Sequence, residues 1–428
     1  MKTFRGVQSL AARLIAHLKY TPILGLAALI GFVRIGIYAR LLSVDEFGLL
    51  SKLLLISGFF CVAGSCGFQI LAQRDLPAMF ARQRYRRGLV ILGKACMITS
   101  LVALLLCVTP MFGYVPLNVA ALALLIAVIH GWAQQSFMLV VLDSRSRLEM
   151  VPYSLQILLR TVLCCVVASG VAMLGGGALG ILLAELVVTV VLSVTLMKKM
   201  LQGIGFSWAV FARLCKTGFT KKEWHVAAIL LLGTTLSFLS TSVDRWLAAD
   251  VLSAKQFGLY SFAWIPLVAA LSMQALLNAG LFPLIAQRRV AGSDQKALRV
   301  TALVSVGLLL AALVLVLLAN KLIAWAIPIW YGQYQDALPL FLPLLAAAAF
   351  RVSDFWSSFL IITHRHVSLL VTQLILIMVA FVYCRFALDG TAWMQNPYNF
   401  TLLALFLAAG NYFANASLAF VVGRRAAS

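Results

Sequence analysis

Acidic residues are scarce in this chain of 428 residues, which has 13 Asp and Glu against 34 Lys and Arg. Charged residues of both signs make up only 11% of the sequence, whereas hydrophobic residues make up 63%. A soluble globular domain has roughly 25% charged and about 45–50% apolar residues, so the composition excludes that class. The mean hydropathy of +1.01 indicates a polytopic membrane protein instead.

Motifs for catalysis and for metal binding are also missing. The sequence contains no Walker A pattern, no GxSxG and no HExxH. Its eight cysteines form no CxxC pair, and its five histidines are scattered along the chain. These absences predict that the chain is not an enzyme and holds no metal.

Apolar runs long enough to cross a bilayer recur along the chain. A helix needs about 20 mostly apolar residues to span a membrane. Twelve such runs are predicted, six on each side of a basic linker at 201–224. They lie at 22–42, 49–71, 89–110, 116–142, 150–173, 177–197, 225–249, 257–283, 300–319, 337–360, 366–387 and 398–422.

Basic residues are concentrated in alternate connections between these runs. Connections on one side, together with both termini, carry 24 Lys and Arg, and those on the other side carry only Lys255, Lys321 and Arg385. The positive-inside rule then places both termini in the cytoplasm. This topology accounts for most of the formal charge of +21 without a nucleic-acid partner.

Two stretches 210 residues apart resemble each other. Leu41–Ser51 and Val251–Ser261 share a Ser, a Phe-Gly-Leu sequence and a final Ser at equivalent positions. Two halves of six spans enter the membrane with the same polarity, so the repeat is parallel, with a pseudo-twofold axis along the membrane normal. The sequence therefore predicts an all-α integral membrane protein whose two six-helix lobes, 22–200 and 225–428, surround a central cavity. An amphipathic interfacial helix is predicted at 1–21.

Seven ionisable side chains fall well inside the predicted runs. A charge at mid-membrane costs about 2.5–3.5 kcal/mol on insertion scales and persists only beside an opposite charge or in a protein-lined cavity. Because the seven lie at several depths, a water-filled cavity is favoured over ion pairs that only hold helices together. They are Arg34, Arg160, Glu185, Asp244, Arg245, Arg351 and Asp354.

Arg34 and Asp244 occupy equivalent positions in the two halves, 210 residues apart. Residues related by a twofold axis can face each other, and these two carry opposite charge. We hypothesise that they pair between the lobes on the outer side when the cavity faces inward. The alternative is that each pairs within its own half.

The tenth run carries a group of polar and aromatic side chains that includes Arg351, Asp354 and Trp356. Arg351 and Asp354 are three residues apart and are expected to share a helix face. Rings stack on apolar sugar faces and polar groups bond hydroxyls, so this set suits a sugar headgroup. The alternative is an aromatic belt at the membrane interface. In the fifth run, Gln156 and Arg160 follow helical spacing on one polar stripe.

Several of these residues resemble a known family. Gly31-Phe32-Val33-Arg34 and Ala39–Gly48 are similar to the opening of the Wzx-type polysaccharide flippases, a branch of the multidrug/oligosaccharidyl-lipid/polysaccharide exporter superfamily. The second half is similar at Asp244-Arg245, Phe257–Tyr260 and Tyr331–Tyr334. The chain departs from the pattern at Ser43, where Gly is frequent, and it lacks the two extra spans of the lipid II flippases.

The resemblance implies a multi-pass transporter of the bacterial inner membrane that uses alternating access. Its substrate would be an undecaprenyl-pyrophosphate-linked oligosaccharide, such as an O-antigen or capsule repeat unit, flipped from the cytoplasmic to the periplasmic leaflet. A polysaccharide polymerase and a chain-length protein are the implied partners, no cofactor is implied, and coupling to H⁺ or Na⁺ stays open. A cation-lined cavity is implied, onto which Arg34, Arg160, Arg245 and Arg351 map. The polar and aromatic residues inside the runs add Asp354, Trp356 and Gln156 to the predicted cavity, and Asp244, Glu185 and Arg34 are the predicted gating or ion-coupling residues.

Two other functions compete with this interpretation. A multidrug or cation antiporter of the same superfamily would favour acidic residues in its lumen, whereas basic groups outnumber acidic ones inside the runs of this chain. A membrane-embedded polysaccharide polymerase or ligase would have a long outer loop with catalytic Arg and His. No outer connection here exceeds roughly 20 residues, and none contains His.

Overall fold

A computed structural model describes residues 2–112, 117, 119–203, 207, 209, 220–291, 294–387 and 395–425. All regular elements in these ranges are helices. Twelve stretches of them are long and apolar enough to cross a membrane, which confirms the predicted all-helical, twelve-span class. Most of the predicted linker 201–224 lies outside the described residues.

The helices of the first half follow the predicted runs closely, with one break. The predicted second run, 49–71, is divided by a turn at 64–67 between two helices. The elements are α1 Lys2–Leu41, α2 Val44–Ala63, α3 Phe68–Ala81, α4 Tyr85–Val108, η1 Thr109–Phe112, α5 Ala121–Ser146, α6 Met150–Met173 and α7 Gly177–Gly203.

In the second half, the predicted eighth and tenth runs are each interrupted. The helix of the eighth run breaks at Trp264, two residues before Pro266, whose ring nitrogen has no proton to donate to the preceding turn. The elements are α9 Lys221–Val251, α10 Ala254–Ala263, α11 Ile265–Ala291, α12 Asp294–Trp330, η3 Gly332–Ala337, α13 Leu338–Ser353, α14 Trp356–Ile362, α15 His366–Ala387 and α17 Pro397–Arg425.

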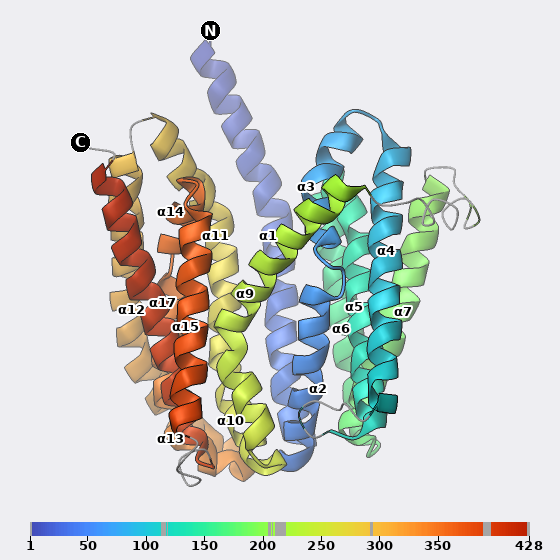
Figure 1. Cartoon of the computed structure of the whole chain (residues 1–428), viewed down its shortest axis with the longest axis vertical. Coiled ribbons are helices and arrows are strands. Elements are labelled where there is room, and N and C mark those ends of the chain that lie inside the picture. The colour runs from blue at the N-terminus through green and yellow to red at the C-terminus, as the bar shows by residue number, and fades with distance from the viewer. Residues whose placement is uncertain are drawn as a thin grey trace. The chain divides into compact units, whose positions relative to one another are not determined.

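The first helix is longer than its membrane-spanning part. Helix α1 continues from the predicted amphipathic stretch 1–21 into the first span without a break (Figure 1). The side-chain surroundings of residues 1–19 lie outside the described part of the structure, so an interfacial position for this stretch stays a prediction.

The described chain forms two compact units whose boundaries differ from the predicted lobes. Unit 1 consists of Met1–Leu41 and Lys52–Thr234, and unit 2 consists of Leu42–Ser51 and Thr235–Ser428. The start of α2 thus packs with the second half of the chain, and the start of α9 packs with the first half. Helices α2 and α9 each contribute residues to both units.

The start of α9 is held in unit 1 by a polar and an apolar contact. The Lys94 ammonium on α4 lies 2.9 Å from the Glu223 carboxylate, and the Trp224 ring meets the Phe68 ring edge-on at 5.2 Å. Gly67 has φ +81°, and a Cβ there would lie 2.0 Å from the Ala227 carbonyl oxygen. Only glycine satisfies both this conformation and this close approach.

The two repeated Phe-Gly stretches contact each other in unit 2. A Cβ on Gly48 would lie 2.1 Å from the Ala254 carbonyl oxygen, and a Cβ on Gly258 would lie 2.2 Å from the Val44 carbonyl oxygen. Val44 and Ala254 are themselves 210 residues apart, so the two contacts are equivalent. The repeat therefore marks a symmetric crossing of the first turns of α2 and α10, which we call the glycine crossing.

Substituting Gly258→Val should destabilise this crossing, because a side chain at that position has no room beside the backbone of α2. Overpacking of this kind costs about 1–3 kcal/mol. We expect a drop of several degrees in the melting temperature of the detergent-purified protein. Gly307→Ala on α12 is the matched control, since no atom lies within 4 Å of its added Cβ. Equal melting temperatures for the two variants would contradict a tight crossing.

Candidate functional site: buried polar clusters

A buried carboxylate organises the polar side chains of unit 1. Glu185 on α7 is only 1% exposed and accepts a hydrogen bond from the Tyr38 hydroxyl at 2.7 Å. The Arg34 guanidinium lies 3.0 Å from the same carboxylate, and His130 Nε2 lies 3.4 Å from its second oxygen. We refer to Arg34, Tyr38, His130 and Glu185 as the Glu185 cluster.

His130 extends this cluster to helix α2. Its Nδ1 lies 2.8 Å from the Ser57 hydroxyl, and its Nε2 lies 3.3 Å from the Gln134 side-chain amide. A neutral imidazole that accepts from the Gln134 amide at Nε2 would donate to the Ser57 hydroxyl from Nδ1, whereas a protonated imidazole would place an N–H beside Glu185. The cluster therefore joins helices α1, α5 and α7 through ionisable groups, and the Ser57 hydroxyl links it to α2. Sequence reasoning missed His130 and Tyr38, although both fall inside predicted spans.

Arg160 lies near this cluster on α6 but has a different environment. Its Nε donates to the Thr189 hydroxyl on α7 at 3.1 Å, and its guanidinium lies 5.1 Å from the centroid of the Phe137 ring. Within the described ranges no carboxylate lies within 4.0 Å of Arg160. Most N–H donors of this half-buried guanidinium therefore stay available for another partner.

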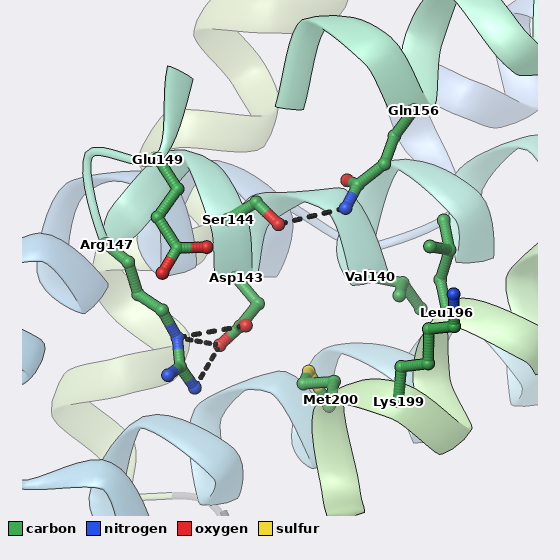
Figure 2. Close-up of a pocket in the computed structure, with 9 residues that line it drawn as sticks. All are labelled: Val140, Asp143, Ser144, Arg147, Glu149, Gln156, Leu196, Lys199 and Met200. Atoms are coloured by element: carbon green, nitrogen blue, oxygen red, sulfur yellow. Dashed lines mark hydrogen bonds and ion pairs between the residues drawn. The ribbon is translucent and has the colours of Figure 1, made fainter. Parts of the chain in front are cut away.

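Gln156 lies one helical turn from Arg160 and belongs to a polar pocket at the end of unit 1. It donates a hydrogen bond to the Ser144 hydroxyl at 3.0 Å. The pocket has a volume of about 190 Å³ (Figure 2). An ion pair between Asp143 and Arg147 forms one wall, with 3.0 Å between the charged atoms. The other charged residues that line the pocket are Glu149 and Lys199.

A second buried carboxylate, Asp244, organises one polar cluster of unit 2. It is 2% exposed and accepts hydrogen bonds from the Tyr260 hydroxyl and from Trp264 Nε1, the latter at 2.9 Å. The Arg245 guanidinium lies 4.6 Å from the centroid of the Trp264 ring. Asp244 and Arg34 each have partners in their own unit, and their pairing between the lobes stays a prediction.

The tenth span is broken at its polar residues. Helix α13 ends at Ser353, and α14 begins at Trp356. Asp354 is the C-cap residue of α13, and its ψ of 83° takes the backbone out of the helical conformation. Arg351 and Asp354 therefore do not share one continuous helix, and no ion pair of 4.0 Å or less joins them. The Arg351 guanidinium instead donates to the Ser240 carbonyl oxygen at 2.7 Å.

Side chains of helix α17 surround the Asp354 carboxylate. The side-chain amides of Asn411 and Asn415 lie 3.3 Å and 3.2 Å from one of its oxygens, and Gln274 on α11 donates to the Asp354 main-chain oxygen at 2.9 Å. Trp356 is 1% exposed and packs against the rings of Tyr412 and Phe420. Its position in the apolar core favours a packing role for this predicted substrate-binding residue.

The structure therefore gathers the predicted charges into separate sites within each unit. Arg34 meets Glu185 in unit 1, and Asp244 lies beside Arg245 in unit 2. Gln156 belongs to the polar pocket, and Trp356 belongs to the apolar core of unit 2. Among the described residues, no group of three or more His, Cys, Asp or Glu side chains is placed to hold a metal ion.

Solved structures with a similar fold are transporters. A mutant of the Vibrio cholerae MATE transporter VcmN has a TM-score of 0.57 and 16% identity over 98% of this chain and 97% of its own. An inward-facing multidrug resistance MATE family transporter of the MOP superfamily has a TM-score of 0.56 and 13% identity, over 96% of this chain and 97% of its own. An outward-facing structure of such a transporter has the same TM-score and 14% identity, over 96% and 95%. These likenesses show a MATE-like fold.

A comparison with curated proteins found no match. The family model described as "Polysaccharide biosynthesis protein" matches residues 20–289, which is more than half of the chain. This match includes both Phe-Gly stretches, the Glu185 cluster and the Asp244 cluster. The chain has a MATE-like fold with twelve candidate membrane spans, and it belongs to the polysaccharide biosynthesis protein family.

Proposed function

We propose that this protein flips a polyprenyl-pyrophosphate-linked oligosaccharide from the cytoplasmic to the periplasmic leaflet of a bacterial inner membrane. Both termini lie in the cytoplasm in this proposal, as the distribution of basic residues predicts. The flipped repeat unit would then be available to a polysaccharide polymerase and its chain-length partner. Membership of the polysaccharide biosynthesis family and the partners of the arginines inside the spans support this function.

Arginines without carboxylate partners are the observation that carries the proposal. Of the four arginines predicted inside spans, only Arg34 has a carboxylate within 4.0 Å among the described residues. Arg160, Arg245 and Arg351 are held by a hydroxyl, an aromatic ring and a carbonyl oxygen, respectively. Because guanidinium groups bind phosphate oxygens through a planar fork of donors, such arginines suit a pyrophosphate.

The buried carboxylates of unit 2 argue against a cation-binding antiporter. Asp244 accepts hydrogen bonds from Tyr260 and Trp264, and Asp354 accepts from two asparagine amides. Neutral donors that already satisfy a carboxylate must be displaced before it can bind an organic cation. Fixed donors of this kind are expected around carboxylates that stabilise the fold.

Arg160 and Gln156 would bind two different parts of the proposed substrate. Arg160 would contact the pyrophosphate, because it is half-buried and keeps free donors. Sugar hydroxyls would reach the polar pocket beside Gln156, which offers both acceptors and donors from Asp143, Glu149 and Lys199 (Figure 2). The two residues are one helical turn apart, about 6 Å along α6, which suits adjacent parts of one headgroup.

Substituting Arg160→Gln should slow flipping strongly, because it removes a charge-assisted contact worth about 1.5–3 kcal/mol. That loss corresponds to roughly 10-fold to 100-fold in rate at limiting substrate. The measurement is leaflet exchange of a fluorescent polyprenyl-pyrophosphate oligosaccharide in proteoliposomes. Arg160→Lys should retain more exchange than Arg160→Gln, since it keeps the charge.

Thr189→Val is the matched control for this experiment. It removes the hydrogen bond that Arg160 makes within the protein but leaves the cation in place, so exchange should stay near the wild-type rate. Failure of the wild-type protein to exchange the lipid, together with efflux of a cationic dye driven by H⁺ or Na⁺, would overturn the flippase in favour of the antiporter.

The Glu185 cluster is our proposed coupling site. Unlike Asp244 and Asp354, the Glu185 carboxylate contacts two ionisable partners, Arg34 and His130. A proton can therefore be shared between Glu185 and an imidazole whose second nitrogen is held by Ser57. Protonation of the Glu185–His130 pair would weaken the attraction between α1 and α7. Proton binding would in this way be linked to the position of these helices.

A pH gradient that is acidic on the periplasmic face should therefore accelerate flipping in proteoliposomes. His130→Gln should remove most of this acceleration while exchange without a gradient persists, because glutamine can still bond Ser57 but cannot carry the proton. Thr99→Val is the control, since among the described residues that buried hydroxyl bonds the Ala95 carbonyl of its own helix and no other helix. Acceleration by a Na⁺ gradient alone, unchanged in His130→Gln, would contradict this assignment.

A further inference from the structure

The elbow between α3 and α4 carries a basic pocket that the proposed transport cycle does not use. Its volume is about 190 Å³, and we call it the elbow pocket. Three arginines and two apolar side chains form most of its lining, together with one carboxylate. The lining residues are Asp75, Ala78, Met79, Arg82, Arg84 and Arg87.

The charge of this pocket is positive and uncompensated. Asp75, its one acidic lining residue, already accepts two hydrogen bonds from Arg74, at 2.6 and 3.1 Å. None of the three lining arginines has a carboxylate within 4.0 Å in the described part of the chain. Three guanidinium groups around a space of this size are suited to one phosphate, since each offers a fork of donors.

Main-chain groups add to the positive potential at the same place. Arg84 is the N-cap residue of the 24-residue helix α4, and its side chain makes no capping hydrogen bond. The first amide groups of such a helix end carry a partial positive charge. The helix begins at a lining residue of the pocket, so this partial charge adds to that of the arginines.

The elbow is a folded turn. The Arg84 amide donates to the Met79 carbonyl and the Gln83 amide donates to the Phe80 carbonyl, both at 2.9 Å. Phe80 is buried, and a Cβ on Gly88 would lie 2.5 Å from its ring, so α3 and α4 are tightly packed beside the turn. The arginines thus extend from a fixed backbone.

The position and the mixed lining favour a lipid over a free ion. The elbow lies in the connection 72–88, which the proposed topology places at the cytoplasmic surface, where anionic headgroups gather. Ala78 and Met79 supply apolar contact for the glycerol and upper acyl region, which inorganic phosphate would not use. We propose that the elbow pocket binds the phosphate headgroup of an anionic phospholipid in the cytoplasmic leaflet.

The test is native mass spectrometry of the delipidated full-length protein titrated with phosphatidylglycerol or phosphatidylcholine. We expect one phosphatidylglycerol to bind more tightly than the rest, with no equivalent for phosphatidylcholine. The triple variant R82Q/R84Q/R87Q should bind it about a hundredfold more weakly, because each basic residue near an anionic headgroup contributes about fivefold. The single variant R84Q should show about fivefold weaker binding. This smaller change tests the pocket even if the triple variant misfolds.

A matched control removes three basic residues from the same predicted face outside the elbow pocket. The exposed residues Lys198, Lys221 and Lys222 are changed to Gln together. Tight binding of phosphatidylglycerol should persist in this control. Equal weakening in both triple variants would show a diffuse charge effect and overturn the proposal.

Two competition arms distinguish the other sources of phosphate. Inorganic phosphate at millimolar concentration should not displace the bound lipid, and displacement would show a simple anion site. A polyprenyl pyrophosphate that displaced phosphatidylglycerol at lower concentration, and lost this ability in R82Q/R84Q/R87Q, would make the pocket part of the transport path and overturn the assignment to phospholipid. The proposal is independent of the flipping assay, because lipid binding is measured without transport.

Discussion

Charged groups in an apolar helix bundle must find their partners inside the protein, and this requirement shapes both compact units. In unit 1 the Glu185 carboxylate is met by a cation, an imidazole and a hydroxyl, so a carboxylate and ionisable partners share one site. In unit 2 Asp244 and Asp354 are met by neutral donors, and the neighbouring arginines bond to a ring and to a main-chain oxygen. In the proposed function the first cluster exchanges a proton, and the second leaves its arginines available for an anion.

Backbone contacts at glycine provide the second constraint. The glycine crossing brings the first turns of α2 and α10 together, and Gly67 allows the turn before α3 to approach α9. Both contacts involve a helix that contributes residues to both units. In the proposed transport cycle, any rearrangement of the units must therefore be accommodated within α2 and α9, because their ends are held by contacts that leave no room for a side chain.

The three proposals assign different kinds of basic residue to different tasks. Arg160 is half-buried and lies among helices, where it can contact a phosphate that enters the membrane region. Arg351 is buried and Arg245 is half-buried, and their contacts with the Ser240 carbonyl oxygen and the Trp264 ring hold them within unit 2, where the proposal has a substrate replace these contacts. The arginines of the elbow pocket are exposed at the protein surface and suit a lipid that stays in its leaflet. The local partners of each arginine, more than the number of charges, separate these proposed roles.

The sequence by itself determined the membrane class, the twelve spans and the Phe-Gly repeat, because hydropathy and spacing are local properties of the chain. It also indicated which charges lie inside spans, but not their partners. The tertiary structure decided that Glu185 meets Arg34 and His130, that the tenth span breaks at Asp354, and that 42–51 packs with the second half. These outcomes depend on the rotation and depth of each helix relative to its neighbours, which packing among distant segments sets.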